Sequence, residues 1–256
     1  MAYAIMQNSL QPPSTIALRN AFRELPSLTD LDAANMAKTA YGIIVRGLPY
    51  NQAETLHHAL ARQGVGTTIV EDQRLPLLPP ATQCRRIDCL ENSLVIYNHL
   101  GQPATRQWRE VSMASAGSVV EEKQKKIEKK RVVRRASSTR FGGIRHDTVV
   151  DVSYRTVREP TMVVEIWLLD AAPPLRYRID GENFSYQYLG SRLQPSRPQN
   201  FRLLLADLYR LTAHALHNRG LIGAASPESP LPAYPSTATY REEVTWLLWR
   251  RASGQA

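Results

Sequence analysis

One stretch, residues 41–72, is enough to predict the fold of the first part of the chain: YGIIVRGLPYNQAETLHHALARQGVGTTIVED. Its first six residues are mostly apolar and β-branched, which predicts a strand. Apolar residues at helical spacing follow, and Asn51 with Glu54 resembles a capping box that opens a helix. Gly64 ends that helix, and Thr67–Glu71 predicts a second strand.

Upstream of this stretch, the pattern predicts one more strand and two more helices. Tyr3–Met6 is a short apolar run that is typical of a strand. Thr15–Leu25 carries apolar residues at helical spacing and is followed by a proline that stops the helix. Thr29, with Asp32 three residues later, predicts the N-cap of the next helix. The predicted order over residues 1–74 is therefore β-α-α-β-α-β.

This order, and the sequence of residues 47–72 in particular, resembles the C-terminal domain of the bacterial ribosomal stalk protein. A Gly turn, an Ala-Glu-x-Leu helix, a terminal Gly and a final strand occur in that family's order. The resemblance implies the fold of a small α/β domain. In the family, binding of translation factors rests on a lysine-bearing pair of helices. In the matching segment 29–38, Lys38 is the only lysine, so the resemblance does not extend to that function.

A second domain is predicted after a proline-containing linker at 75–82, where the period of the apolar residues changes to two. The alternation is clearest on the two sides of an Asp-Gly pair, which indicates a hairpin turn. A helix over Gln199–His217, with a regular apolar stripe, closes the domain. The predicted strands are Cys84–Cys89, Leu94–Tyr97, Arg109–Ala114, Val149–Tyr154, Met162–Leu169, Leu175–Ile179 and Phe184–Tyr188.

Seven strands followed by one helix look like a pleckstrin-homology-like domain of the bacterial type. Residues 93–117, SLVIYNHLGQPATRQWREVSMASAG, fit that family's opening: a strand, a Gly turn, and then Trp108 leading a strand. The resemblance implies a seven-stranded barrel with a closing helix over residues 83–222. A different small barrel or a curved sheet stays open as an alternative. The chain as a whole is thus predicted to be α+β, with the small domain first and the barrel second.

A strongly basic segment, residues 118–146, is inserted between the third and fourth predicted strands. Ten Lys and Arg lie from Lys123 to Arg145 and only Glu128 opposes them there, so most of the formal charge of +9 is local. The first half of the segment is rich in helix formers but has almost no apolar residue, so we expect an exposed helix or a loop. The candidate anion-binding residues are Lys125, Lys126, Lys129, Lys130, Arg131, Arg134, Arg135, Arg140 and Arg145.

Two further features are candidate interaction sites. After a Pro-rich linker at 223–238, residues 239–252 predict a helix with Trp246 and Trp249. Two tryptophans in a short helix must bury against something, either the parent domain or a partner, and we take both as candidate partner contacts. The sequence RRASS fits the preference of basophilic kinases and makes Ser137 a candidate phosphoacceptor, although such motifs are short and common.

Motifs for catalysis, cofactors and metals are missing from the sequence. It has no GxGxxG, no Walker-type loop, no HExxH and no CxxC. Cys84 and Cys89 are five apart on one predicted strand, so they would face opposite sides and could not share a metal. His214 and His217 have helical spacing but no carboxylate close to them in the sequence. We therefore expect no enzyme, no cofactor and no metal.

Composition places the chain among globular proteins, since 43% of its residues are hydrophobic and only 21% are charged, which argues against disorder throughout. Two cysteines, no signal-peptide pattern and no long apolar run predict a cytoplasmic protein without a membrane span.

We expect a non-enzymatic regulatory or scaffold protein of bacterial type that acts through contacts with an unidentified protein. The alternative is a protein that binds nucleic acid or acidic lipid through the basic insertion. An enzyme built from dispersed residues is a third hypothesis.

Overall fold

The computed structural model describes residues 1–98, 100–136, 144–224, 226 and 229–254, and the side chains at 130–136 and 144–149 lie outside that description. The chain is mixed α+β and divides into two compact units. We call Met1–Val119 with Thr161–Ala256 the body, and Val120–Pro160 the hairpin.

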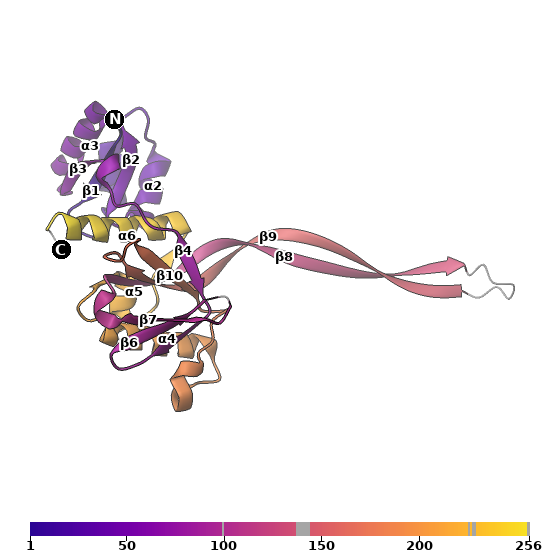
Figure 1. The fold of residues 1–256 in the computed structure, drawn as a ribbon. Helices are drawn as coiled ribbons and strands as arrows, with labels where there is room; N and C mark the ends of the chain where they lie inside the picture. The colour runs from indigo at the N-terminus through magenta and orange to yellow at the C-terminus, as the bar shows by residue number, and fades with distance from the viewer. Residues whose placement is uncertain (99, 137–143, 225, 227–228, 255–256) are drawn as a thin grey trace. The chain divides into compact units, whose positions relative to one another are not determined.

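Most of the helices and strands are labelled in Figure 1. The helices are α1 (Thr15–Phe22), α2 (Asp30–Thr39), α3 (Tyr50–Arg62), α4 (Arg197–Leu211), α5 (Arg219–Gly223) and α6 (Thr237–Ala252), with 3₁₀ turns η1 (Asp72–Arg74), η2 (Trp108–Glu110) and η3 (Gln187–Arg192). The strands are β1 (Tyr3–Gln7), β2 (Ile43–Leu48), β3 (Thr67–Glu71), β4 (Ala81–Cys84), β5 (Arg86–Cys89), β6 (Ser93–Tyr97), β7 (Pro103–Gln107), β8 (Met113–Ala136), β9 (Ile144–Leu168), β10 (Leu175–Asp180), β11 (Leu216–His217) and β12 (Ala233–Tyr234).

The N-terminal part has the predicted order β-α-α-β-α-β, with β1 antiparallel to both β2 and β3. The capping box of α2 is confirmed: the Thr29 amide donates to Asp32 Oδ2 (2.8 Å) and the Asp32 amide donates to Thr29 Oγ1 (3.2 Å). The capping box predicted at Asn51 is wrong, because α3 already begins at Tyr50. Pro49 is the N-cap there and makes no side-chain bond, because its hydrocarbon ring has no acceptor atom.

The second part is built on a six-stranded sheet in the order β11-β8-β9-β10-β4, with β12 also paired to β8. Strands β5, β6 and β7 form a separate three-stranded sheet. Among the described strands no sheet closes on itself, so the α+β class is confirmed and the pleckstrin-homology-like barrel is not seen.

Two of the strands predicted in this part are wrong. Cys84–Cys89 is not one strand: the chain leaves β4, which is parallel to β10, and enters β5, which pairs with β6. Phe184–Tyr188 is not a strand either, since it makes one isolated bridge and then enters η3. Phe184 and Tyr186 are buried and Tyr188 is half-buried against the core, so an irregular segment shows the same apolar spacing as a strand.

Three other predicted boundaries also change. Arg109–Ala114 is not one strand: η2 ends at Glu110, β8 begins at Met113, and the strand before them, β7, was missed. Val149–Tyr154 and Met162–Leu169 are parts of one strand, β9. The helix predicted to reach His217 ends at Leu211, because the chain turns at Thr212 and then pairs as β11 with β8.

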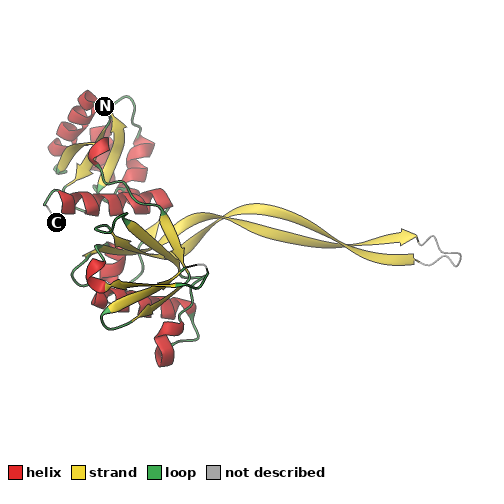
Figure 2. Ribbon diagram, in the orientation of Figure 1, coloured by secondary structure: helices red, strands yellow, loops and turns green. Residues whose placement is uncertain are grey.

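The basic insertion was predicted to be an exposed helix or a mobile loop, and for residues 118–136 and 144–146 this prediction is wrong. Residues up to Ala136 belong to β8, and β9 begins at Ile144 and pairs with it (Figure 2). The return strand supplies the reason, because Val150, Val152 and Tyr154 are of the β-branched and aromatic types that favour strands. A strand partner outweighs the modest helix propensity of Glu, Lys and Arg.

Helix α6 covers two sheets of the body. On one side Tyr240 and Val244 pack with Trp167 of β9. On the other side Trp246 packs with the face of the N-terminal sheet that α1, α2 and α3 leave uncovered. Helix α4 packs on the opposite face of the large sheet, where Leu204 and Leu208 belong to the largest apolar cluster.

Candidate functional site

The hairpin, which contains the basic insertion, has no core of its own. All of its described side chains, at 120–129 and 150–160, are exposed or half-buried. An isolated two-stranded ribbon is only marginally stable in water, because one pair of strands buries little apolar surface. The hairpin therefore adds little to a hydrophobic core, and its surface is the first region to consider for binding.

Ion pairs across the two strands occupy the part of the hairpin that lies nearest the body in sequence. Arg158 donates to Glu122 through Nε (3.0 Å) and Nη2 (2.8 Å), and Lys125 pairs with Glu159. These side chains are 39–76% exposed, and such pairs contribute about 0–1 kcal/mol each. They help to fix the register of the strands more than they add to stability.

Charge is distributed unevenly along the hairpin. Val120–Pro160 contains twelve Lys and Arg against six Asp and Glu, which is +6 of the chain's formal +9. Residues 129–145, around the connection between the strands, contain seven Lys and Arg and no Asp or Glu. The excess of cations thus lies toward the connection, and the ion-paired part is close to neutral.

Cations are placed on both faces of the ribbon. Lys125 and Lys126 are neighbours in β8, so their side chains leave opposite faces, and they are 55% and 51% exposed. The sequence repeats such adjacent basic pairs at 129–130 and 134–135. A surface with cations on both faces suits a partner that surrounds the ribbon better than a flat anionic plane.

The predicted anion-binding residues are partly located by the structure. Lys125, Lys126 and Lys129 are exposed on β8. Lys130, Arg131, Arg134 and Arg135 lie in β8 and Arg145 lies in β9, as backbone positions. Arg140 and the candidate phosphoacceptor Ser137 fall outside the described residues.

Sequence reasoning missed two cations that belong to the same surface, Arg155 and Arg158, which are exposed on β9. They follow the basic run by ten residues or more and look isolated in the sequence. The pairing of β8 with β9 brings them into the ribbon. The β-branched run before them was the available signal for a return strand.

The two candidate partner residues on α6 make contacts within the chain. Trp246 is 4% exposed, and its Nε1 donates to the Gln7 carbonyl (2.7 Å). Gly42 lies against its ring, at a φ of +94°, and a Cβ there would be 2.3 Å from Trp246 Cγ. Trp249 is half-buried beside the same apolar cluster. Trp246 thus has little surface left for another protein.

The thiols and histidines of the body show no arrangement typical of a catalytic or metal site among the described residues. Burial raises the pKa of Cys84 to about 11 and that of Cys89 to about 12, so both thiols stay protonated near neutral pH. His217 Nε2 lies 2.9 Å from Thr212 Oγ1, and burial lowers the pKa of this ring. In the part of the chain that the structure describes, no three His, Cys, Asp or Glu side chains gather as metal ligands would.

Charged groups in the body are buried in two hydrogen-bonded networks that the sequence did not reveal. Glu165 accepts from Arg176 Nη2 (2.5 Å) and Arg178 Nη1 (2.8 Å) on the neighbouring strand. Glu243 of α6 accepts from the Arg219 side chain and from the Tyr234 hydroxyl (2.7 Å). Both carboxylates are fully buried, and their partners make them structural elements of the fold.

Comparison with known proteins adds no relative to this description. No protein-family model, no curated protein and no solved structure matches the chain. No helix among the described residues is long and apolar enough to cross a membrane. Any function must therefore be argued from the geometry and charge of the chain itself.

Proposed function

We propose that this protein binds double-stranded nucleic acid by placing the β8–β9 ribbon in a groove between two phosphate backbones. One observation carries the proposal: the basic segment of the chain lies in a two-stranded ribbon, and two exposed lysines, Lys125 and Lys126, leave its opposite faces, each paired with an exposed or half-buried carboxylate, Glu159 and Glu128. The major groove of B-form DNA, about 12 Å wide, admits a two-stranded ribbon, and a phosphate backbone runs along each of its walls.

The length of the ribbon fits an elongated partner. From Val120 to Ala136, β8 covers roughly 55 Å at about 3.3 Å per residue. The Lys and Arg of β8 are spread from Lys123 to Arg135, so several of them can contact phosphates along a duplex, and each phosphate contact releases condensed counterions. The resemblance of residues 83–222 to a pleckstrin-homology-like domain is kept in this proposal, with β8 and β9 each belonging in part to the sheet of the body and in part to the hairpin.

Duplex is favoured over single strands by the scarcity of aromatic residues. Proteins that bind single strands stack bases on aromatic side chains. Over Val120–Pro160 the sequence has only Phe141 and Tyr154. Backbone electrostatics therefore dominates the expected affinity, and sequence preference is expected to be weak.

An equilibrium binding assay with the full chain tests the proposal. The probe is a fluorescent 30-base-pair duplex, measured by anisotropy from 50 to 300 mM salt. We expect the logarithm of the affinity to fall linearly with the logarithm of the salt concentration, with a slope steeper than about −4. Neutralising Lys125, Lys126 and Lys129 together to Gln is expected to make that slope shallower by up to about three.

A matched control removes the same charge elsewhere. Lys38, Arg109 and Arg241 are exposed in the body, so their triple change to Gln lowers the net charge equally. We expect little change in the slope for this control. Equal losses in the two triple variants would reject a hairpin site. Binding to phosphatidylserine vesicles in place of duplex would reject nucleic acid and make an acidic membrane the target.

A further inference from the structure

One face of the hairpin carries a row of apolar side chains that phosphate contacts do not explain. Val150, Val152 and Tyr154 alternate along β9, so they leave the same face of the ribbon. Their exposed fractions are 42%, 47% and 67%. Single exposed apolar residues are common on protein surfaces, whereas a row of them on one face indicates a contact surface.

Ion pairs across the strands show which residues of β8 share this face. Arg158 Nη2 donates to Glu122 Oε1 at 2.8 Å, and side chains that meet across two strands leave the same face. Arg158 is four residues after Tyr154, so the even-numbered residues of both strands belong with the apolar row. Lys125 and Glu159 pair on the other face. We call the even-numbered side chains over 120–129 and 150–160 the apolar face, and the odd-numbered ones the basic face.

On the apolar face, the charges cancel in pairs. Glu122 pairs with Arg158, and Lys126 Nζ lies 2.7 Å from Glu128 Oε1. No other charged residue of the sequence belongs to this face. The apolar face is therefore neutral, and its exposed valine and tyrosine side chains are what it presents to a partner.

On the basic face, three cations have no such partner. Lys123, Lys129 and Arg155 make no ion pair and no side-chain hydrogen bond with the residues that the structure describes. Two of the carboxylates on this face have partners already, and Asp151 is the remaining one. Ammonium and guanidinium groups make strong, charge-assisted hydrogen bonds to phosphate. The two faces thus suit different parts of a ligand.

The major groove of DNA has the same two parts. Its floor presents base edges, on which the C5-methyl group of thymine is the apolar feature, and phosphates line its rims. A ribbon that lies with its apolar face on the floor brings Val150 and Val152 to the base edges. Because the groove is about 8.5 Å deep, the basic face is then near the rims, where Lys129 and Arg155 reach phosphates.

A second copy of the chain suits the apolar face less well. Stable protein interfaces use about 20–30 residues from each partner, whereas this row has three. Two hairpins would also bring together formal charges of +6 each, which repel one another. The negative charge of DNA complements the hairpin, so a duplex is the occupant that the charges favour.

We propose that the apolar face contacts the C5-methyl groups on the floor of the major groove, and that the chain therefore prefers DNA that carries them. The inference rests on the proposed function, to which it adds the orientation of the ribbon and a modest base preference. Val150 and Val152 are the contacting residues, and Tyr154 extends the row. Burial of one methyl group raises an affinity roughly fourfold.

Two changes in the DNA test this without altering its charge. Replacing thymine by uracil removes the methyl group, and replacing cytosine by 5-methylcytosine adds one at the same ring position. In the anisotropy assay, the full chain is expected to bind the uracil duplex about four- to fifteenfold more weakly than the thymine duplex. The methylated duplex is expected to bind more tightly than its parent by a similar factor. The salt dependence should not change, because no phosphate contact is lost.

Variants of the ribbon assign the effect to one face. Val150→Gln with Val152→Gln is expected to remove the difference between the thymine and uracil duplexes. The matched control, Ile127→Gln with Val157→Gln, changes two apolar residues of the basic face and is expected to keep that difference. If the first variant binds no duplex at all, Val150→Thr with Val152→Thr retains β-branched side chains in the strand and is expected to reduce the difference by at least half.

The outcomes separate this inference from the function on which it rests. Equal binding of the thymine and uracil duplexes, with a steep salt dependence, overturns the inference and leaves the proposed function in place. Loss of the difference in the control variant also overturns it. Absence of binding to every duplex rejects both. A dimer in sedimentation that Val152→Gln dissociates makes a second copy the occupant of the apolar face and overturns the inference.

Discussion

The body and the hairpin differ in how deeply their paired charged side chains are buried. In the body, Glu165 and Glu243 are fully buried and each is held by arginine. In the hairpin, the paired side chains of Lys125 and Glu159 stay open to water. Buried pairs fix the fold, because removing one partner leaves a charge without compensation. Exposed pairs contribute little to stability, so the charges of the hairpin remain available to a partner.

The largest expected effect comes from Glu243→Ala. Arg219 would lose its buried carboxylate partner and the Tyr234 hydroxyl its acceptor, so the free energy of unfolding is expected to fall by about 3–5 kcal/mol in urea titrations. The matched change in the hairpin, Glu159→Ala, is expected to cost less than about 1 kcal/mol. Equal losses in the free energy of unfolding at the two positions would contradict this contrast between the body and the hairpin.

A smaller effect is expected from pH. Burial lowers the pKa of His217 in the folded chain below its ordinary value of 6.5, so the folded state favours the neutral ring. Its contribution to stability is complete above that ordinary value and is lost as the pH falls through the folded pKa. Proton NMR titration should place the imidazole pKa below 6.5. From pH 7.5 to 5.0, His217→Gln should lose less stability than the unchanged chain does.

The smallest effect on stability is expected from removing the hairpin. Replacing residues 124–157 with Asn-Gly deletes only exposed or half-buried side chains among those that the structure describes. The free energy of unfolding is expected to stay within about 1 kcal/mol, because no buried apolar surface is lost. Duplex binding is expected to disappear in the same variant. A large loss of stability would show that the hairpin belongs to the core.

The same contrast explains what the sequence could predict. Local rules predicted the order of elements in the N-terminal part, where the Thr29 cap and the Gly64 stop mark the ends of helices, and failed only at the Asn51 cap. They failed in the basic segment, because its conformation depends on a partner strand that follows the connection. Propensity in strands depends on cross-strand neighbours, which a single segment does not contain.

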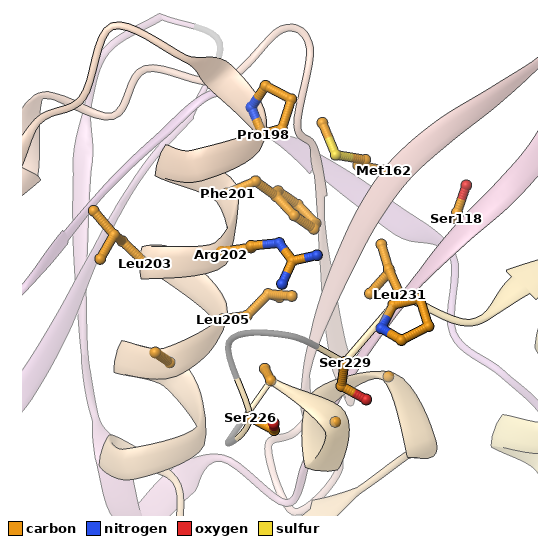
Figure 3. Close-up of a pocket in the computed structure, with 15 residues that line it drawn as sticks. Ser118, Met162, Pro198, Phe201, Arg202, Leu203, Leu205, Ser226, Ser229 and Leu231 are labelled. Atoms are coloured by element: carbon orange, nitrogen blue, oxygen red, sulfur yellow. The ribbon is translucent and has the colours of Figure 1, made fainter.

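The candidate sites likewise differ in whether local sequence or the folded chain reveals them. The basic residues of β8 were found from composition, whereas Arg155 and Arg158 needed the strand pairing. The pocket of the body that Phe201 and Leu231 help to line (Figure 3) was not predicted at all, since these residues come from segments thirty residues apart and share no motif. Such a site exists only after the chain has folded.

The position of α6 has a consequence for how the chain is made on the ribosome. The face of the N-terminal sheet that contains Met6 and Ile43 packs against Trp246. Synthesis proceeds from the N-terminus, so this apolar face is complete long before the helix that covers it emerges. During that interval the nascent chain presents an uncovered sheet face, on which general chaperones could act. Emergence of α6 from the exit tunnel is then the event that covers this face.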